Sequence, residues 1–319
     1  MWVDLWSGIM IIQTGMRTDI PAFYSDWLIN RIKDGYVLVR NPYNPFQVTR
    51  YSLSPDVVDL IAFCTKNPAP MLPKMEALEP YGQYWFVTIT PYGRDIEPYV
   101  PDKEKVMTDF RKLSDRISAD NIGWRYDPIF VDSKHTVDWH ISQFERMARN
   151  LSGYTKTCVI SFIDIYQKVK RNFSEAKEVF RKDRMAIGRA FIDIAKRYDI
   201  TIRPCAEGKE LEAYGADCAG CMTTETYETA LKASLQVPKK KNQRNGECAC
   251  LLGADIGAYD TCGHLCRYCY ANANTVLVEE NRKRHDPKSP FLTGNSEPGD
   301  VIHQADQRSW IDYQMRFEL

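Results

Sequence analysis

Residues 84–90 read Tyr-Trp-Phe-Val-Thr-Ile-Thr, and this run predicts a buried β-strand because aromatic and β-branched residues follow one another without a break. The polar, turn-prone sequence Pro-Tyr-Gly-Arg follows at residues 91–94. Beyond it, apolar side chains recur at the spacing of one helix face, at Val106, Phe110, Leu113 and Ile117. A strand, a polar loop and an amphipathic helix in this order indicate an α/β fold.

The same alternation continues on both sides of this unit. Apolar runs predict further strands at residues 9–12, 60–64, 124–131, 157–163 and 200–203. Amphipathic stretches predict helices at residues 22–32, 137–151 and 185–198. The turn sequence Asn-Pro-Tyr-Asn-Pro at residues 41–45 separates two β-rich runs and indicates a hairpin. With about six strands between helices and no obvious linker, the simplest architecture is a partial or complete (β/α) barrel over residues 10–204.

Polar loops follow the predicted strands. In (β/α) barrels the catalytic groups gather at the mouth that the carboxyl ends of the strands form. The residues that we predict to bind cofactor or substrate there are Arg17, Asp19, Lys66, Asn67, Arg125 and Asp127. Simpler interpretations stay open, because most loops are polar and because Arg125 and Asp127 could form a structural pair beneath the rim. Tyr92, Tyr126 and Tyr166 are either hydrogen or electron relays or packed aromatic side chains.

The overall charge is balanced. With 42 basic and 42 acidic residues, the 319-residue chain has a formal net charge of zero, which argues against a nucleic-acid-binding or membrane-surface protein. No apolar run approaches the roughly 20 residues that span a bilayer. The N-terminus carries Asp4 where a signal peptide would have basic residues, and Met10 is the more natural start. We therefore expect a cytoplasmic protein of one large or two small domains.

The ten cysteines are unevenly placed. Only Cys64 and Cys158 lie before residue 200, where they suit buried apolar positions. The others fall between residues 205 and 269. A secreted disulfide scaffold would be shorter and rich in cysteine throughout. The dense block therefore indicates metal binding in a reducing compartment, in a cysteine-rich segment over residues 205–275.

Residues 262–270 read Cys-Gly-His-Leu-Cys-Arg-Tyr-Cys-Tyr, so Cys262, Cys266 and Cys269 have the spacing C-x3-C-x2-C. Three thiolates this close together can hold three corners of one four-iron, four-sulfur (4Fe-4S) cluster. The fourth iron then stays open to a small molecule, whereas most iron–sulfur electron carriers use four cysteines. A zinc knuckle or unrelated thiols are the alternatives.

This run resembles the signature of the radical S-adenosylmethionine (SAM) superfamily, including the aromatic residue before the last cysteine, here Tyr268. The resemblance implies that the open iron binds SAM and that the reduced cluster cleaves SAM to a 5′-deoxyadenosyl radical. Tyr268 and Asn272 are then the cofactor-binding candidates beside the cluster. The chain has no convincing Gly-Gly-Glu segment of the kind that recognises the amino group of SAM.

The motif lies late in this chain, whereas in that superfamily it follows the first barrel strand. Either the barrel is permuted, with a late strand near residues 254–256 leading into the cysteine loop, or the cluster segment is appended to a different barrel. We favour the permuted barrel, since it places the cluster at the same mouth as the polar strand ends.

Five segments of the chain resemble an uncharacterised prokaryotic family, a domain of unknown function whose C-terminus carries a radical-SAM-like cysteine cluster. They are Arg17–Ala22, Val37–Pro42, Thr65–Pro68, Trp124–Ile129 and Asp255–Cys262. The resemblance extends from Met10 to about Trp310. It implies an iron–sulfur protein and indicates no substrate.

The cysteines upstream of the motif predict a second iron–sulfur cluster, because this many thiols in polar sequence do not suit a hydrophobic core. The ligands that we assign to it are Cys205, Cys218, Cys248 and Cys250, with Cys221 as a spare or an alternative ligand. The competing assignment is one zinc ion held by Cys218, Cys221, Cys266 and Cys269. Those two pairs lie far apart in the sequence, and Cys262 would then have no role.

The sequence thus predicts a radical SAM enzyme of unknown substrate, reduced by a flavodoxin- or ferredoxin-type electron donor. A non-enzymatic iron–sulfur redox sensor and a zinc-stabilised nucleic-acid-binding module are the alternatives. The last would use the basic stretch Lys239–Arg244, and the neutral overall charge disfavours it. Residues 276–319 are charged and rich in Pro and Gly, and they predict an extended C-terminal segment that packs over the domain.

Overall fold

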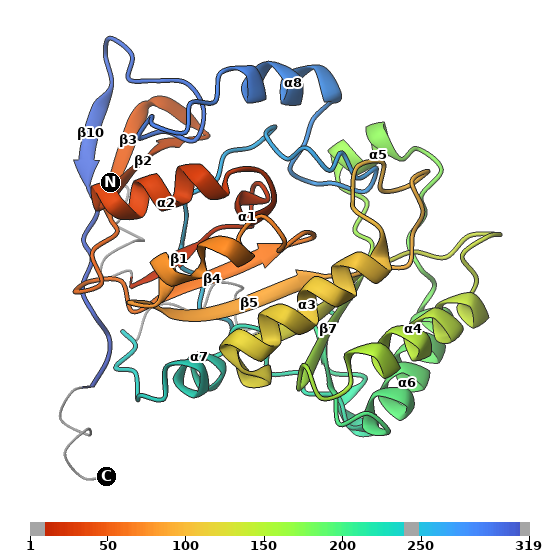
Figure 1. The fold of residues 1–319 in the computed structure, drawn as a ribbon. Coiled ribbons are helices and arrows are strands. Elements are labelled where there is room, and N and C mark those ends of the chain that lie inside the picture. Colours follow the sequence, from red (N-terminus) through yellow and green to blue (C-terminus); the bar gives the residue numbers. More distant parts are fainter. Residues whose placement is uncertain (1–9, 239–248, 313–319) are drawn as a thin grey trace.

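The computed structural model describes residues 10–238 and 249–312. Its centre is a seven-stranded sheet in the order β8-β7-β6-β5-β4-β1-β9, in which all neighbouring strands are parallel (Figure 1). The strands are β1 (Ile11–Gln13), β4 (Leu60–Thr65), β5 (Gly82–Thr88), β6 (Ile122–Ile129), β7 (Thr157–Phe162), β8 (Thr201–Pro204) and β9 (Ala254–Asp255). The fold is therefore α/β, as the alternating sequence pattern predicts.

Helices lie between the parallel strands, because the chain must return to the same end of the sheet before each new strand. The α-helices are α1 (Ile20–Phe23), α2 (Ser25–Asp34), α3 (Lys103–Ile117), α4 (Val137–Leu151), α5 (Gln167–Asn172), α6 (Arg181–Lys196), α7 (Thr224–Leu231) and α8 (Thr275–Lys283). Short 3-10 helices are η1 (Leu72–Leu78), η2 (Ala119–Asn121) and η3 (Glu212–Tyr214). Of the described helices, none is long and apolar enough to cross a bilayer.

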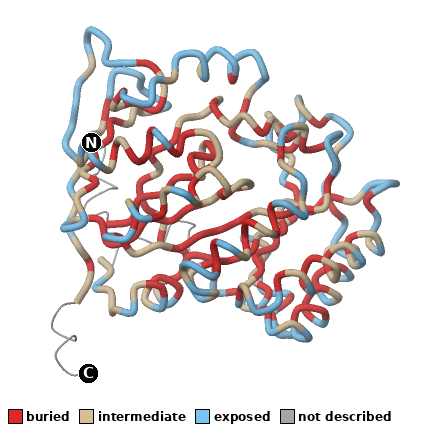
Figure 2. Tube along the Cα trace, in the orientation of Figure 1, coloured by how far each residue is buried: buried red, intermediate tan, exposed pale blue. Residues whose placement is uncertain are grey.

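The two faces of the main sheet are covered differently, because successive side chains along a strand point to opposite sides. On one face Ile12 and Trp85 belong to a large core with residues of α2, α3, α4 and α6. On the other face Ile11 and Tyr84 belong to a smaller core with α7 and Trp310. Figure 2 shows buried chain along the strands, between partly exposed helices. In a (β/α) barrel the face that carries Ile11 and Tyr84 would line the interior. Here α7 and Trp310 cover this face.

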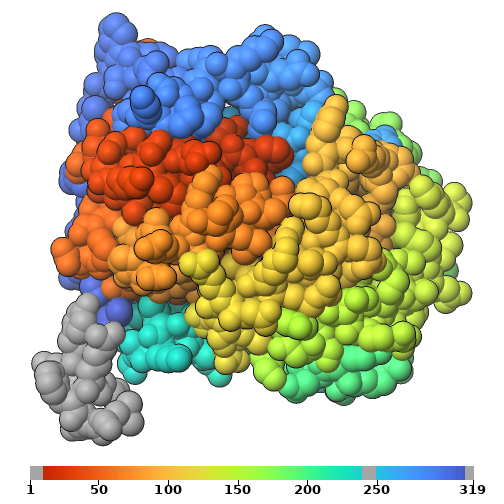
Figure 3. All heavy atoms as spheres, viewed as in Figure 1, coloured from red at the N-terminus to blue at the C-terminus, as the bar shows by residue number. Residues whose placement is uncertain are grey.

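A second sheet holds the C-terminal segment against the N-terminal part of the fold. β2 (Tyr36–Asn41) and β3 (Asn44–Ser52) form the predicted hairpin, and β10 (Val301–Gln304) pairs in parallel with β3. Carbonyl groups of residues 287–289 accept hydrogen bonds from side chains of α2. In Figure 3 this C-terminal segment, in blue, lies along α1 and α2, in red. The predicted extended tail is therefore partly regular, since it contains α8 and β10.

The short strand β9 decides how the cysteine motif is connected to the sheet. Ile12 of β1 lies opposite Ala254, and Gln13 lies opposite Asp255, so β9 pairs in parallel with β1. This confirms the late strand expected near residues 254–256, and the motif follows a strand of the main sheet itself. Among the strands that the structure describes, none joins β9 to β8. Within the described residues the sheet is therefore open, and a closed (β/α) barrel is not formed there.

Candidate functional site

A cavity of about 430 Å³ lies at the carboxyl ends of the parallel strands. Its wall includes residues that follow β1, β4, β7 and β8, the end of β6, and the cysteine loop after β9. The predicted site residues in this wall are Arg17, Asp19, Lys66, Arg125, Asp127, Cys205, Cys250, Cys262, Cys266, Tyr268 and Cys269. The fold thus brings the motif cysteines and most of the chosen strand-end residues to one place, where α/β proteins bind their ligands.

The three cysteines of the motif are buried or half-buried in the cavity wall. Backbone N–H groups of Ala271 and Asn272 point at Cys269 Sγ, at 3.3 and 3.4 Å. Burial raises the pKa of all three thiols, and that of Cys266 reaches about 12. The thiols therefore keep their protons at neutral pH until a metal displaces them.

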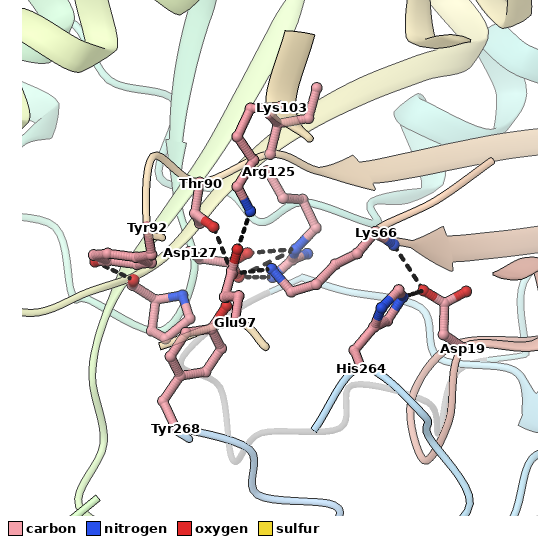
Figure 4. A network of polar contacts seen from close by, with 12 residues as sticks. Asp19, Lys66, Thr90, Tyr92, Glu97, Lys103, Arg125, Asp127, His264 and Tyr268 are labelled. Atoms are coloured by element: carbon pink, nitrogen blue, oxygen red, sulfur yellow. Dashed lines mark hydrogen bonds and ion pairs between the residues drawn. The ribbon is translucent and has the colours of Figure 1, made fainter. Parts of the chain in front are cut away.

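A carboxylate that no sequence motif indicated, Glu97, lies fully buried beside the cysteine loop (Figure 4). Its Oε1 accepts hydrogen bonds from Lys66 Nζ at 2.8 Å, from the Thr90 hydroxyl at 2.6 Å and from the Tyr268 hydroxyl, and its Oε2 binds Lys103 Nζ. The aromatic residue of the motif is therefore anchored through its hydroxyl group. Glu97 lies in the loop after β5. The sequence indicated a polar strand end at residues 91–94 nearby, but it did not indicate Glu97 itself.

This network places positive charge near the motif. Burial acts to raise the pKa of Glu97, but the charges of Lys66 and Lys103 outweigh it and lower the pKa to about 2. Burial also acts to lower the pKa of Lys66, but Glu97 and Cys266 raise it above its ordinary value. Two ammonium groups therefore share one carboxylate, and Lys66 is close enough to Cys266 to act on its charge.

Asp19 ties the cysteine loop to two strand ends. Its Oδ2 accepts hydrogen bonds from His264 Nε2 at 2.9 Å and from the Lys66 backbone N–H at 2.7 Å. Its Oδ1 accepts from the Ala22 backbone N–H at 3.0 Å and so caps α1. The same carboxylate thus joins the loops after β1, β4 and β9. His264 lies inside the motif, but the cysteine spacing did not indicate this role.

Arg125 and Asp127 form a second ion pair at the end of β6, with side chains only 13% and 14% exposed. Arg125 Nη2 lies 2.5 Å from Asp127 Oδ2, and Arg125 Nη1 lies 3.8 Å from Cys221 Sγ. Burial acts to lower the pKa of Arg125, but Asp127 and Cys221 raise it well above its ordinary value. The structural pair that the sequence left open is therefore formed, and the same pair also lines the cavity.

Three of the upstream cysteines gather beside Arg125. Cys221 Sγ lies 4.0 Å from Cys205 Sγ and 3.8 Å from Cys250 Sγ, and all three line the cavity. Cys221, which the sequence analysis gives as a spare or an alternative ligand, is therefore at the centre of this group. Cys218 belongs to the main hydrophobic core and is not in the cavity wall. Cys248 and the basic stretch Lys239–Arg244 lie outside the described residues.

Two predicted site residues have local structural roles instead. Asn67 Oδ1 accepts a hydrogen bond from the Ala69 backbone N–H at 3.3 Å. Asn272 Nδ2 donates to the Cys262 carbonyl at 2.8 Å. Neither residue is in the cavity wall. They shape the loops that carry the cysteines and Lys66, because Asn side chains readily bond nearby backbone groups.

The remaining predicted polar residues lie at different depths. Arg17 is in the cavity wall, with its Nε 2.9 Å from Asp255 Oδ1 of β9. Tyr92 and Tyr126 are fully buried, and their hydroxyl groups bind the Pro128 carbonyl and a ring nitrogen of His140. Tyr166 alone of the three tyrosines lines the cavity.

The thiols in the cavity wall and their neighbours are the donors to consider for a metal centre. In the described part of the chain, no three or more His, Cys, Asp or Glu side chains are grouped so that they could hold one metal ion. The zinc site of Cys218, Cys221, Cys266 and Cys269 is therefore not formed. The thiolates of a 4Fe-4S cluster bind separate irons, so they need not converge on one point. Three cavity-lining thiols with N–H donors at Cys269 and a cation at Lys66 suit such a cluster.

A family model matches most of the sequence. The model for a domain of unknown function, DUF1848, matches residues 11–271. The chain belongs to the DUF1848 family. The matched range contains all seven strands of the main sheet and the complete C-x3-C-x2-C motif, whereas α8 and β10 follow it. Both groups of thiols in the cavity are therefore part of the DUF1848 domain.

Solved structures similar to this DUF1848 chain are remote. A spore photoproduct lyase mutant is 13% identical with a TM-score of 0.41, and the alignment covers 61% of this chain and 61% of that protein. An endo-fucoidan hydrolase of glycoside hydrolase family 107 is 9% identical with a TM-score of 0.23, over 63% of this chain and 32% of the hydrolase. Similarity at such low identities and TM-scores supports no conclusion about function. No protein of curated function matches the sequence.

Proposed function

We propose that this DUF1848 protein is a radical SAM enzyme. In this proposal Cys262, Cys266 and Cys269 hold a 4Fe-4S cluster whose open iron binds SAM. When bound and reduced, the cluster supplies the electron that cleaves SAM to methionine and a 5′-deoxyadenosyl radical, which acts on a substrate in the cavity. The observation that supports the proposal is that three thiols with this spacing line one cavity with the polar strand ends.

The groups around the three cysteines suit the negative charge of thiolates. An anionic centre in a site of low dielectric needs cations and N–H donors close by. Lys66 supplies a cation near Cys266, and Ala271 and Asn272 supply backbone N–H groups at Cys269. Tyr268, bound to Glu97, fixes the chain between the last two cysteines.

A radical formed at the cluster would enter this cavity, whose wall combines the cysteine loop with the polar strand ends. Asp19 and Lys66 are bound to the cysteine loop and its neighbours, so we assign them a positioning role. Arg17, Arg125 and Asp127 remain the candidates for contact with SAM or substrate. We also include a flavodoxin- or ferredoxin-type electron donor, a second iron–sulfur cluster and a cytoplasmic location in the proposal.

Anaerobic reconstitution with iron and sulfide, followed by reduction with dithionite in the presence of SAM, tests this function. We expect a brown protein that converts SAM to 5′-deoxyadenosine and methionine. Cys266→Ala should lose this activity, whereas Cys158→Ala, which changes a thiol of the main core, should keep it. A wild-type protein that binds iron and sulfide but releases no 5′-deoxyadenosine would refute the proposal.

A further inference from the structure

A second group of thiols lies in the same cavity but does not belong to the C-x3-C-x2-C motif. We propose that Cys205, Cys221 and Cys250 bind the second iron–sulfur cluster, with Arg125 as its charge partner. The inference rests on the proposed function and changes the ligand set that the sequence predicted, because Cys221 takes the place of Cys218.

The three cysteines are held in place by the backbone of separate segments. Cys205 follows β8, and its N–H binds the Ile160 carbonyl of β7 at 2.8 Å. The segments that carry Cys221 and Cys250 pair with each other through N–H groups of residues 249 and 251, which bind the carbonyls of residues 219 and 222 at 2.9 and 2.7 Å. The group is therefore part of the folded framework, as a rigid cofactor site requires.

The backbone also makes room for the sulfur of Cys250 and donates to it. Gly220 has a φ of +133°, and a Cβ atom at this position would lie only 2.9 Å from Cys250 Sγ. The Met222 backbone N–H points at the same sulfur at 3.4 Å. N–H donors of this kind stabilise a thiolate ligand and tune the metal centre it binds.

Arg125 supplies a fixed positive charge to this group. Its Nη1 lies 3.8 Å from Cys221 Sγ, while Nε and Nη2 are held by Asp127. A guanidinium group stays protonated throughout the physiological pH range. Several thiolates gathered in a buried site would repel one another strongly without such a partner. A charge partner for the thiolates is therefore a reason for a largely buried Arg at this position.

The sulfur separations show that the three thiols form one compact group. Two thiolates on one tetrahedral metal lie roughly 3.8 Å apart when each metal–sulfur bond is about 2.3 Å long. The Cys221–Cys250 distance of 3.8 Å and the Cys205–Cys221 distance of 4.0 Å each fit such a pair. In the described residues, however, no three such side chains are grouped to hold one ion. Thiolates on different irons of one cluster lie farther apart than these sulfurs, so we expect the three side chains to spread when the cluster binds.

Iron and sulfide analysis of reconstituted full-length protein tests the ligand set. We expect the triple variant of Cys205, Cys221 and Cys250 to Ala to lose about half of the iron and sulfide of the wild type. The triple variant of Cys262, Cys266 and Cys269 to Ala should lose the other half, and Cys218→Ala should match the wild type. If the variant without Cys205, Cys221 and Cys250 kept the iron content of the wild type, the inference would be overturned. This would hold even if the variant without the motif cysteines lost iron as expected. Iron loss in Cys218→Ala would also overturn it.

Potentiometry tests the charge partner, with the three motif cysteines changed to Ala so that only the second cluster contributes. Arg125→Gln should lower the midpoint potential, because removing a positive charge disfavours the more negative reduced state. Asp127→Asn should raise it, because Arg125 then acts without its counter-ion. Shifts of opposite sign cannot come from a general loss of structure. Equal potentials in all three proteins would overturn the assignment of Arg125.

Discussion

The two groups of thiols in the cavity differ in how the chain assembles them. Cys262, Cys266 and Cys269 lie in one short loop, whose spacing alone places their sulfurs near one another. Cys205, Cys221 and Cys250 come together only because β8 and the segments on either side of residues 239–248 meet at the same end of the sheet. A local motif is therefore visible in the sequence, whereas an assembled group is visible only in the fold.

The two groups also share a feature: beside each lies a largely buried cation that is paired with a carboxylate. Near the motif the pair is Lys66 and Glu97, with Lys103 as a second ammonium group. Near the assembled group it is Arg125 and Asp127. The first pair has an extra positive charge, whereas the second is balanced, so we expect the motif side to depend more strongly on its charges.

Removing the carboxylate on the motif side should have the largest effect on stability. Glu97→Gln leaves Lys66 and Lys103 buried without a counter-ion, and we expect the free energy of unfolding to fall by about 3–5 kcal/mol. Glu104→Gln is the matched control, because the Glu104–Arg146 pair is exposed and should contribute about 1 kcal/mol at most. Urea unfolding of both variants measures the difference. Equal losses would remove the contrast between buried and exposed pairs.

The same carboxylate should make the protein sensitive to acid. The pKa of Glu97 is about 2 in the fold, against an ordinary value of 4.5, so its stabilising contribution is complete above pH 4.5 and is lost as the pH falls towards 2. Between about pH 5.5 and 3.5, wild-type protein should therefore lose more unfolding free energy than Glu97→Gln. A parallel decline of the two proteins in urea titrations at both pH values would contradict this expectation.

A change at Gly220 should act on the assembled group alone. Gly220→Ala adds a Cβ atom close to Cys250 Sγ at a φ of +133°, and we expect a loss of about 1–3 kcal/mol together with less iron at the second cluster. Gly153→Ala is the control, because its φ is also positive, at +82°, but nothing lies within 4 Å of the added atom. Iron analysis in the background without motif cysteines separates the two variants. Full iron content in Gly220→Ala would show that the close approach is unimportant.

The smallest effect is expected from the hydroxyl group of Tyr268. Tyr268→Phe removes one of four donors to Glu97 and should lower the unfolding free energy by about 1.5 kcal/mol, with the motif cluster still assembled. Tyr43→Phe, at an exposed position, should change nothing. Loss of motif iron in Tyr268→Phe would mean that the anchor to Glu97 is needed to form the cluster loop at all.

Hydrophobic periodicity was sufficient to predict much of the fold. The helix expected at residues 137–151 is α4, and the strands expected at residues 60–64 and 157–163 are β4 and β7 within a residue. These segments are buried on a regular repeat, so their pattern survives in the sequence. α8 and β10 were not predicted, because β10 is short and pairs with the distant strand β3, and because the second half of α8 is mostly charged.

The candidate site was predicted in part. Asp19, Lys66, Arg125 and Asp127 were found because they stand at strand ends, and parallel strands bring their ends together. Glu97, Lys103 and His264 were missed, because a polar side chain in a loop gives no sign of its partner. Cys221 and Cys218 are only three residues apart in sequence. Nothing local shows that Cys221 lines the cavity and that Cys218 packs into the main core instead.

The sequence by itself determined the α/β class, the order of most strands along the chain and the C-x3-C-x2-C loop, because these depend on neighbours within a few residues. The tertiary structure decided the rest. Pairing of β9 with β1 carries the late motif to the strand ends, and the meeting of three segments gathers Cys205, Cys221 and Cys250. These outcomes depend on contacts between residues far apart in the chain, and only packing of the whole domain selects them.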